Sequence, residues 1–416
     1  MTARKTFVIV GAGLAGAKAA QTLREEGFDG RVVLLGAERE RPYERPPLSK
    51  EVLRGEAPPD KAYVHHEGFY EEHEIELRTR TAVEQIDTAG ADVVLGGGER
   101  LPYDGLLLAT GARPRRLSLP GAELDGVYEL RTLDDCAALR ERLQEGARVA
   151  VIGAGWIGAE VAASARQKGL DVTVVEPLST PLERVLGAEV GAVYRDVHEA
   201  HGVRMLLGRG VVAFEGDDRV GAVRTDDGER IECDFVVVGV GVTPRTELAQ
   251  RAEIAVDDGI VVDEFLQSRT PGVFAAGDVA GAHHPLFGRS IRIEHWANAL
   301  NQGIAAARNM LGAGAAYDRV PYFYSDQYDV GMEYSGYAPQ WDEVVIRGDT
   351  AAREFIAFWL RDGRVLAGMN VNVWDVTDPI QALVRSREPV DTERLADPGT
   401  PLEELVPGVN AGRSGA

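Results

Sequence analysis

A glycine-rich motif occurs twice in this chain, and it constrains the fold more than any other feature. Residues 11–16 read GAGLAG and residues 153–158 read GAGWIG, each directly after a short apolar run. In this GxGxxG spacing one glycine allows a tight turn, one lets a pyrophosphate approach the backbone, and one lets helix and strand pack closely. The repeat predicts two related dinucleotide-binding units.

The similarity between the two units extends beyond the glycines. Small residues after each motif predict helices over residues 15–26 and 157–168, and a second apolar strand follows each helix. Residues 106–115 also match residues 236–245, each after a polar hairpin that carries Gly-Glu-Arg. This βαβ order predicts parallel sheets with helices on their faces.

A further strand and glycine cluster at residues 272–278 is expected to return to the first unit. The second unit is therefore predicted as an insertion in the first. The fold class is α/β, with two Rossmann-like dinucleotide-binding domains and a C-terminal α+β domain. The predicted domains are residues 1–113 with 243–320, residues 114–242, and residues 321–416.

The C-terminal domain has a different residue pattern, because aromatic and apolar residues alternate there with polar ones. A helix is expected to open at Thr377, with Asp378 as its cap and Pro379 at the first helical position. The tail from Asp397 is rich in Pro and Gly and is expected to be mobile. The antiparallel strands expected before the helix cover residues 344–347, 354–360 and 365–374.

Charge and cysteine content exclude several classes of function. The 416 residues include 45 Lys and Arg against 66 Asp and Glu, a net charge of −21, which repels nucleic acids and acidic membrane surfaces. The apolar run at residues 7–10 is too short for a signal peptide or a membrane span. Cys136 and Cys233 are too far apart for a CxxC pair and are expected to be inert core thiols. We expect a cytoplasmic protein without a nucleic-acid or membrane partner.

An acidic residue ends the second strand of each unit. Glu38 follows the run at residues 32–35, where an acid accepts hydrogen bonds from adenosine ribose hydroxyls. Glu176 has the same place in the second unit, and a carboxylate there favours NADH because it would repel the 2′-phosphate of NADPH. Arg184 leaves an alternative open, since its guanidinium could receive that phosphate, bind pyrophosphate or remain solvated.

Two further segments resemble the remaining FAD motifs of the two-dinucleotide-binding flavoprotein reductases, which share the glutathione-reductase-like fold. They are Ala109-Thr110-Gly111 and residues 270–278, which read TPGVFAAGD. By this resemblance Asp278 hydrogen-bonds the ribityl chain of FAD; the alternative is a turn acid that caps the next helix. FAD is then expected in the first unit and NAD(H) in the second, with hydride transfer from nicotinamide C4 to flavin N5.

The loop at residues 39–50, RERPYERPPLSK, resembles the ferredoxin-reductase branch that serves oxygenases. Residues 292–303, RIEHWANALNQG, and the aromatic C-terminal domain extend the resemblance over nearly the whole chain. That branch includes the putidaredoxin, rubredoxin and biphenyl-dioxygenase ferredoxin reductases, with apoptosis-inducing factor as a cousin. Relatives with a disulfide relay, or with the single cysteine of NADH oxidases and peroxidases, need a thiol beside the flavin, and this sequence has none at those places.

The resemblance assigns catalytic roles to Lys50, Glu160 and Trp296. Lys50 is expected beside flavin N5, where an ammonium stabilises the negative charge of the reduced ring, and Glu160 is expected to pair with it. Trp296 is expected to stack on the flavin and nicotinamide, and the helix that begins near Glu294 to direct its N-terminal amides at the flavin C2 carbonyl. Without the family, Lys50 reads as a surface residue, Glu160 as a solvated first-turn acid, and Trp296 as a core residue.

The complete prediction for cofactor binding combines the motifs with the resemblance, and His295 is included only for its position. The FAD residues are Gly11, Gly13, Ala15, Gly16, Glu38, Arg45, Pro47, Lys50, Ala109, Thr110, Gly111, Gly277, Asp278, Glu294, His295 and Trp296. The NAD residues are Gly153, Gly155, Ile157, Gly158, Glu160, Glu176, Arg184 and Gly241. No metal is expected, because the histidines lack i,i+4 or cysteine partners.

The predicted function is an NADH-dependent reductase that passes single electrons from FAD to a [2Fe-2S] ferredoxin of a cytochrome P450 or Rieske oxygenase system. Small ferredoxins are usually acidic, so a local basic patch is expected to dock them, formed by Arg41, Arg45, Arg289 and Arg292. For Arg41 and Arg45 neutralisation of the FAD pyrophosphate or of nearby acids is an equal alternative. A rubredoxin reductase, an NADH oxidase, and a redox-sensing flavoprotein like apoptosis-inducing factor remain alternatives.

Overall fold

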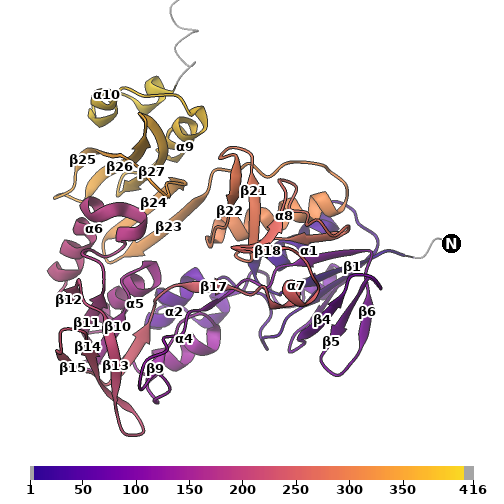
Figure 1. Ribbon diagram of the computed structural model, residues 1–416, viewed down its shortest axis with the longest axis horizontal. Helices are drawn as coiled ribbons and strands as arrows, with labels where there is room; N and C mark the ends of the chain where they lie inside the picture. Colours follow the sequence, from indigo (N-terminus) through magenta and orange to yellow (C-terminus); the bar gives the residue numbers. More distant parts are fainter. Residues whose placement is uncertain (1–3, 407–416) are drawn as a thin grey trace, which may run out of the picture. The chain divides into compact units, whose positions relative to one another are not determined.

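The computed structural model describes residues 4–406 (Figure 1). The chain divides into two compact units, each made of several segments. Unit 1 comprises Met1–Arg45, Pro59–Arg113 and Val242–Pro321. Unit 2 comprises Pro46–Pro58, Pro114–Gly241 and Tyr322–Ala416. Residues 46–58, which the sequence assigns to the first domain, therefore make their contacts in unit 2. The division into three domains stays a prediction.

Unit 1 is built around a parallel sheet of five strands in the order β20-β7-β1-β2-β3. The sheet elements are β1 (Thr6–Val10), β2 (Arg31–Leu35), β3 (Ile75–Arg78), β7 (Gly105–Leu108) and β20 (Val273–Ala275). The return of β20 beside β7 makes unit 1 discontinuous in sequence. Its strands are continuous apolar runs because both faces of the sheet are buried.

Helices α1 (Leu14–Glu25) and α8 (Trp296–Met310) pack closely in unit 1. The approach depends on Gly303, where a Cβ would lie 2.3 Å from the carbonyl oxygen of Ala15. The other elements of unit 1 are η2 (Pro59–Ala62), α3 (Phe69–Glu72), β4 (Val83–Asp87), β5 (Asp92–Leu95), β6 (Arg100–Pro102), β8 (Ala112–Pro114), β17 (Val242–Pro244), α7 (Glu247–Arg251), β18 (Val256–Asp257), β19 (Gly259–Val262), β21 (Ala280–His284) and β22 (Arg289–Ile291).

Unit 2 repeats the same sheet in the order β12-β11-β10-β16-β9, again entirely parallel. The two units also share a backbone hydrogen bond at the start of the glycine motif. The Gly11 N–H donates to the Leu35 carbonyl at 2.8 Å, and the Gly153 N–H donates to the Val175 carbonyl at 2.9 Å. The predicted fold class is confirmed. The elements are β9 (Val127–Tyr128), β10 (Arg148–Ile152), β11 (Asp171–Glu176), β12 (Arg204–Leu207), β16 (Phe235–Val238), α2 (Glu51–Arg54), α4 (Leu133–Arg140), α5 (Trp156–Gln167) and α6 (Glu183–Ala200), with η1 (Pro46–Ser49).

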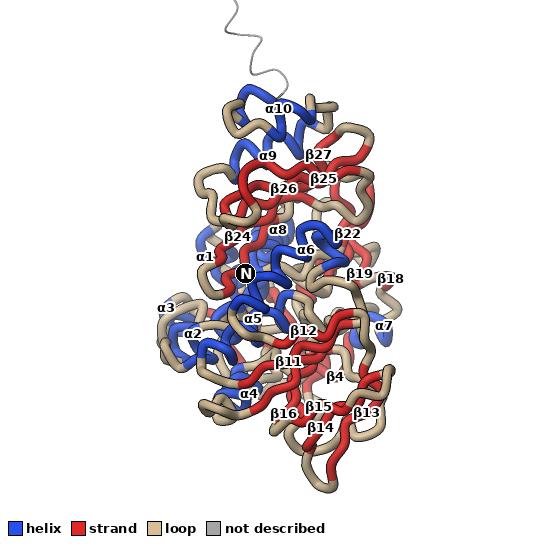
Figure 2. The backbone as a smooth tube through the Cα atoms, turned by 90° about the vertical axis from the view of Figure 1, so that its left-hand side faces the viewer, coloured by secondary structure: helices blue, strands red, loops and turns tan. Residues whose placement is uncertain are grey.

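Two further sheets complete unit 2 (Figure 2). A three-stranded antiparallel layer packs over the parallel sheet through apolar side chains such as Phe214 and Val223. A five-stranded antiparallel sheet of order β23-β24-β27-β26-β25 packs on α6, where the Trp359 indole donates to the Leu186 carbonyl at 3.0 Å. The strands are β13 (Val211–Gly216), β14 (Val220–Thr225), β15 (Arg230–Glu232), β23 (Tyr322–Gln327), β24 (Val330–Gly336), β25 (Glu343–Asp349), β26 (Glu354–Arg361) and β27 (Arg364–Val371).

The C-terminal helices correct one detail of the sequence prediction. Helix α9 (Thr377–Ser386) begins at Thr377 as expected, but Val376 is its N-cap and Asp378 lies inside the first turn. The Thr377 hydroxyl donates to Glu333 at 3.0 Å, a long-range partner that the local pattern could not reveal. Helix α10 (Thr392–Ala396) and η3 (Leu402–Leu405) follow.

The segment from Asp397, expected to be mobile, has specific contacts over its first part. The Arg347 guanidinium donates to the carbonyl oxygens of Asp397 at 2.7 Å and Thr400 at 2.6 Å. Residues 407–416 lie outside the described residues, and the mobility of the tail stays a prediction. Within residues 4–406 no helix is long and apolar enough to cross a membrane.

Candidate active site

The first glycine motif forms a cradle whose three glycines do three different things. A Cβ on Gly11, where φ is +117°, would lie 2.1 Å from the Ala109 carbonyl oxygen, and a Cβ on Gly16 would lie 2.0 Å from that of Gly11. A Cβ on Gly13 would meet no described atom within 4 Å. Gly11 and Gly16 therefore close the turn against the sheet, while Gly13 leaves open space in front of α1.

The second motif has the same geometry. A Cβ on Gly153 would lie 2.6 Å from the Gly239 carbonyl oxygen, one on Gly158 would lie 2.0 Å from that of Gly153, and one on Gly155 would meet no described atom within 4 Å. Among the described residues, no side chain caps the N-terminus of α1 or α5. Each helix therefore offers free backbone N–H groups to an anion, which is the fit that a pyrophosphate requires.

Glu38 lies three residues beyond the end of β2 and is held by the loop that follows it. The Tyr43 hydroxyl donates to the Glu38 carboxylate at 2.5 Å, and the Arg45 guanidinium lies 3.5 Å from its other oxygen. The Glu38 side chain is 43% exposed, whereas Tyr43 is buried. Tyr43 was missed by the sequence analysis, although its place in the proline-rich loop directly after Glu38 was the available signal.

Glu176, at the end of β11, has a different environment. Its carboxylate is buried and accepts hydrogen bonds from the backbone N–H groups of Ala154 at 2.7 Å and Leu178 at 3.0 Å. Because Ala154 belongs to the glycine motif, Glu176 fixes the cradle itself. A carboxylate has about four acceptor positions, so the same group can still receive ribose hydroxyls.

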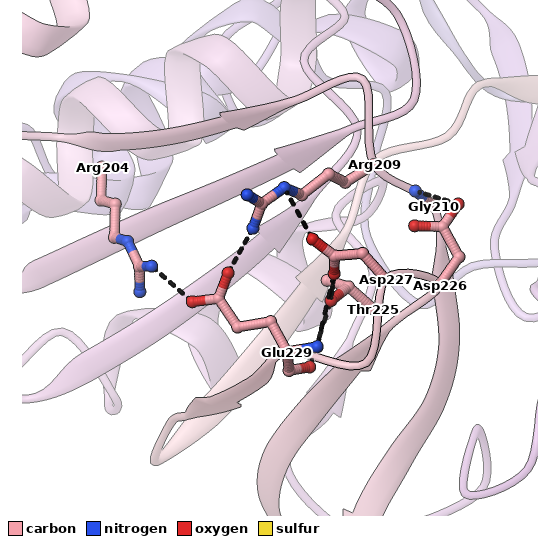
Figure 3. A network of polar contacts seen from close by, with 7 residues as sticks. All are labelled: Arg204, Arg209, Gly210, Thr225, Asp226, Asp227 and Glu229. Carbon is pink, nitrogen blue, oxygen red and sulfur yellow. Dashed lines mark hydrogen bonds and ion pairs between the residues drawn. The ribbon is translucent and has the colours of Figure 1, made fainter.

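Two of the arginines that follow Glu176 in unit 2 are paired with acids, and a third is exposed. Arg209 N–H donates to the Glu176 carbonyl at 3.1 Å, but its guanidinium pairs with Asp227 at 3.2 Å and with Glu229 (Figure 3). Arg204 pairs with the same Glu229. Arg184 is exposed in the first turn of α6. The guanidinium adjacent to the acid is therefore already neutralised.

The turn that carries Asp278, in the segment that resembles an FAD motif, is held by α8. Gly277 N–H donates to the buried Gln302 amide oxygen at 2.9 Å, which fixes the turn that carries Asp278. The Thr110 hydroxyl donates to the Arg245 carbonyl at 2.8 Å. This hydrogen bond joins the segments 59–113 and 242–321 of unit 1. Gln302 was missed as a site residue, although it stands within the motif at residues 292–303.

The N-terminus of α8 carries three of the predicted FAD residues. His295 is its N-cap residue, and burial lowers the pKa of this histidine to about 4 against the opposing charge of Asp278, so the imidazole is neutral near pH 7. Burial raises the pKa of Glu44, although a side-chain hydrogen bond with Trp296 lowers it. Glu294 pairs with Arg292 at 2.5 Å.

Lys50 and Glu160 form an ion pair inside unit 2. The Lys50 ammonium lies 2.9 Å from the Glu160 carboxylate, and the two side chains are only 9% and 6% exposed. Lys50 precedes α2, and Glu160 projects from α5. The Ser49 hydroxyl donates to the second carboxylate oxygen at 2.5 Å. The structure thus brings together the two residues that the family resemblance paired.

The remaining predicted residues take less distinctive places. Ala15 is buried on α1, Ile157 is 44% exposed on α5, and Pro47 lies in η1 of unit 2. The Gly241 carbonyl accepts the N–H of Arg115 at 2.9 Å. The roles of all these residues stay predictions.

Neither cysteine is suited to thiol chemistry. Cys136 and Cys233 are free and buried, and burial raises the pKa of each thiol to about 11. At neutral pH both are protonated, and only the thiolate is a nucleophile. Within residues 4–406 no three His, Cys, Asp or Glu side chains gather in a way that could hold a metal ion.

Comparison with known proteins agrees with this geometry. The sequence pattern of the family described as pyridine nucleotide-disulphide oxidoreductase matches residues 5–303, and a second pattern, described as reductase C-terminal, matches residues 322–406. The chain belongs to the pyridine nucleotide-disulphide oxidoreductase family. It is therefore an oxidoreductase that binds FAD and NAD(H).

Individual relatives match over their full lengths. The chain is 41% identical over 404 residues to the ferredoxin–NAD(+) reductase component of the anthranilate 1,2-dioxygenase system of Burkholderia cepacia, covering 96% of this chain and 99% of the relative. It is 36% identical over 422 residues to putidaredoxin reductase of Pseudomonas putida, covering 100% of both.

Solved structures give the same result. The covalent putidaredoxin reductase–putidaredoxin complex contains a chain that superposes with a TM-score of 0.94 at 36% identity, covering 99% of this chain and 100% of that one. A ferredoxin reductase for the CYP199A2 system of Rhodopseudomonas palustris superposes with a TM-score of 0.93 at 37% identity, covering 97% and 100%.

Proposed function

We propose that this protein is the FAD-containing, NADH-dependent ferredoxin reductase of an oxygenase system. One observation carries the proposal: the chain holds two complete dinucleotide cradles and no accessible thiol, since both cysteines are buried with raised thiol pKa values. Reducing equivalents must therefore leave from the cofactor rather than from a disulfide relay. The full-length similarity to reductase components supports an iron-sulfur protein as the acceptor.

The two units divide the binding of the cofactors. FAD, when bound, supplies the chemistry of accepting a hydride and releasing its electrons one at a time. In unit 1 the free amides of α1 hold its pyrophosphate, Glu38 accepts the ribose hydroxyls, and Asp278 accepts the ribityl chain. In unit 2 the free amides of α5 hold the pyrophosphate of NADH, and Glu176 accepts its ribose hydroxyls.

The buried Lys50 and Glu160 pair holds an ammonium and a carboxylate at fixed positions. As the family resemblance implies, the Lys50 ammonium would stabilise negative charge on FAD, and Glu160 would hold the ammonium and offset its charge before NADH binds. Both side chains are almost completely removed from solvent, so their charges are little screened. Trp296 stacks on the cofactor rings in this proposal.

NADH is preferred over NADPH because the acid and its neighbours disfavour a 2′-phosphate. Glu176 presents a negative charge, and the adjacent Arg209 is neutralised by Asp227 and Glu229. Arg184 is exposed in the first turn of α6, and removal of its charge is expected to leave the preference for NADH unchanged.

A [2Fe-2S] ferredoxin of a P450 or Rieske oxygenase system is the proposed acceptor, and the docking patch is narrower than the sequence suggested. Arg289 is exposed on β22. Arg292 is only 9% exposed and pairs with Asp258 and Glu294, so the structure does not favour it as a docking residue. Arg45 pairs with Glu38, and the Arg41 guanidinium lies 3.6 Å from the centre of the Tyr63 ring. We therefore propose Arg289 as the principal docking cation.

The decisive experiment is anaerobic reduction of the purified flavoprotein by NADH, followed by stopped-flow mixing with a [2Fe-2S] ferredoxin. Fast reduction followed by fast reoxidation supports the proposal. Rapid NADH consumption with oxygen alone indicates an oxidase, faster reoxidation by rubredoxin indicates a rubredoxin reductase, and a persistent long-wavelength band with slow turnover indicates a redox sensor. A protein that binds no flavin overturns the proposal.

The docking assignment has its own test. Arg289→Glu should lower the rate of ferredoxin reduction and flatten its dependence on ionic strength, because rim charges act mainly on the association rate. Arg116→Glu, which reverses a side chain that is 80% exposed, is the control. Equal effects of the two variants would assign the change to net charge and not to a docking site.

A further inference from the structure

A row of buried polar side chains runs inside unit 2 from Glu160 to α6. Strand β23 supplies two of them, because its alternation turns Phe323, Ser325 and Gln327 inward. Ser325 is 2% exposed and Gln327 is 1% exposed, while the alternating residues Tyr324 and Asp326 are exposed. Polar residues at the inward positions of a strand are unusual, since burial of a polar group costs free energy unless it is hydrogen-bonded.

Each member of the row is hydrogen-bonded to the next. The Ser325 hydroxyl donates to the Glu160 carboxylate at 2.6 Å, on the same oxygen that faces Lys50. The Gln327 amide nitrogen donates to the Ser325 hydroxyl at 3.4 Å. The Gln327 amide oxygen lies 2.9 Å from Nε2 of His198, and the Tyr328 hydroxyl lies 3.3 Å from Nδ1 of His198.

The Glu160 carboxylate at one end of the row determines which group donates in every hydrogen bond of the row. A carboxylate only accepts, so Ser325 must donate to Glu160, Gln327 must donate to Ser325, and the free amide oxygen of Gln327 must accept from His198. His198 then carries its proton on Nε2 and accepts from Tyr328 on Nδ1. Burial supports this neutral form, because it lowers the pKa of His198 to about 4.

All donors therefore point the same way, towards one anion. Aligned hydrogen bonds polarise one another, and a bond to a charged acceptor is stronger than a neutral one. The structural role of the row alone could be filled by apolar side chains, because β23 and α6 already pack through an apolar cluster that includes Phe323 and Tyr194. What the polar row adds to this packing is a set of donors directed towards the carboxylate at its end.

We propose that Ser325, Gln327 and His198 are positioning residues that hold the Glu160 carboxylate in place and, through it, the Lys50 ammonium. Glu160 then receives Lys50 and Ser325 on one oxygen and Ser49 on the other, so neither oxygen can rotate away without losing a partner. This inference rests on the proposed function in one respect, namely that Lys50 acts on the flavin.

The first test reads the row directly and does not depend on the reaction. In the ¹⁵N-histidine NMR spectrum of the full-length holoprotein, His198 should show the Nε2–H tautomer at pH 7, with the signal assigned by its loss in His198→Gln. Gln327→Leu removes the acceptor of that proton, so it should broaden the signal or shift it towards the other tautomer. An Nδ1–H tautomer or an imidazolium in the unmutated protein overturns the proposed direction.

The second test reads the effect on the cofactor through the midpoint potential of the bound flavin and its rate of reduction by NADH. Ser325→Ala should shift the potential in the same direction as Glu160→Gln and slow reduction about tenfold, the equivalent of one hydrogen bond to a charged group. Ser325→Thr keeps the hydroxyl and should restore both. Ser335→Ala is the matched control, since Ser335 is also 2% exposed and accepts from Gln381 instead.

The outcomes separate the two claims. If Glu160→Gln shifts the potential and Ser325→Ala does not, the positioning role is wrong while the role of the ion pair stands. If Glu160→Gln leaves the potential unchanged, Lys50 and Glu160 do not act on the flavin, and the inference falls with that part of the proposed function. If Ser335→Ala matches Ser325→Ala, the effect is general loss of packing, and the positioning role is again wrong.

Discussion

The two dinucleotide cradles share a backbone but differ in how they use their acid. In both, the outer glycines pack against backbone and the middle glycine faces open space. Glu38 is partly exposed and is held by side chains of the next loop, whereas Glu176 is buried and bonded to the backbone of its own cradle. The glycine spacing therefore determines the turn. The residues around each acid determine whether its carboxylate is left for the ligand, as at Glu38, or also holds the backbone of the cradle, as at Glu176.

Substitution of the glycines should give the largest effects and should separate packing from binding. Gly16→Ala places a Cβ 2.0 Å from a backbone carbonyl, so we expect loss of flavin and of the folded state of unit 1. Gly13→Ala meets open space and has an extended backbone, so it should keep the unfolding temperature of the apoprotein and only weaken flavin binding. Flavin absorbance per protein and thermal unfolding measure the two. Equal loss of stability in both variants contradicts the assignment.

Acid should destabilise unit 2 through its buried histidine. The pKa of His198 is lowered from 6.5 to about 4, so between these values the unfolded chain binds a proton that the folded chain does not. The stability present above pH 6.5 is therefore lost as the pH falls towards 4, by about 3 kcal/mol at most. Urea unfolding of the protein and of His198→Gln across this range measures it. A variant that is as acid-sensitive as the parent shows that His198 does not contribute.

Removal of the two acids should test the comparison most directly. Glu176→Ala leaves the N–H groups of Ala154 and Leu178 unsatisfied, so it should cost about 1–3 kcal/mol of stability and weaken NADH binding. Glu38→Ala should weaken FAD binding with a smaller loss of stability, because Glu38 is partly exposed and its partners are side chains of the next loop rather than backbone groups of a cradle. Denaturant unfolding of the apoproteins and titration with each dinucleotide give the values. The reverse order of stabilities would break the comparison.

The smallest expected effect concerns the choice between NADH and NADPH. Asp227→Asn combined with Glu229→Gln releases the Arg209 guanidinium, and the KM for NADPH should fall several-fold while the KM for NADH changes little. Glu232→Gln, which removes one of the two carboxylate partners of Arg230, is the control. An unchanged ratio of the two KM values would show that Arg209 does not reach the 2′ position.

The elements that the sequence predicted well are those specified by short patterns. The helices expected over residues 15–26 and 157–168 differ from α1 and α5 by one residue at each end, since glycine spacing and helix start are local features. The strand that carries Ser325 was not recognised, because two of its three inward positions, Ser325 and Gln327, are polar and its outward positions include Tyr324. The period-two placement of these polar residues after Phe323 was the available signal.

By itself the sequence determined the two cradles, the repeated parallel sheets and the absence of a thiol relay, because each depends on residue types at fixed spacings along one segment. The tertiary structure alone decided that Glu176 supports its own cradle, that Arg292 is neutralised, and that Ser325 of β23 donates to Glu160. These depend on which distant side chains share a buried space, and a buried charge takes its properties from the partners that folding brings to it.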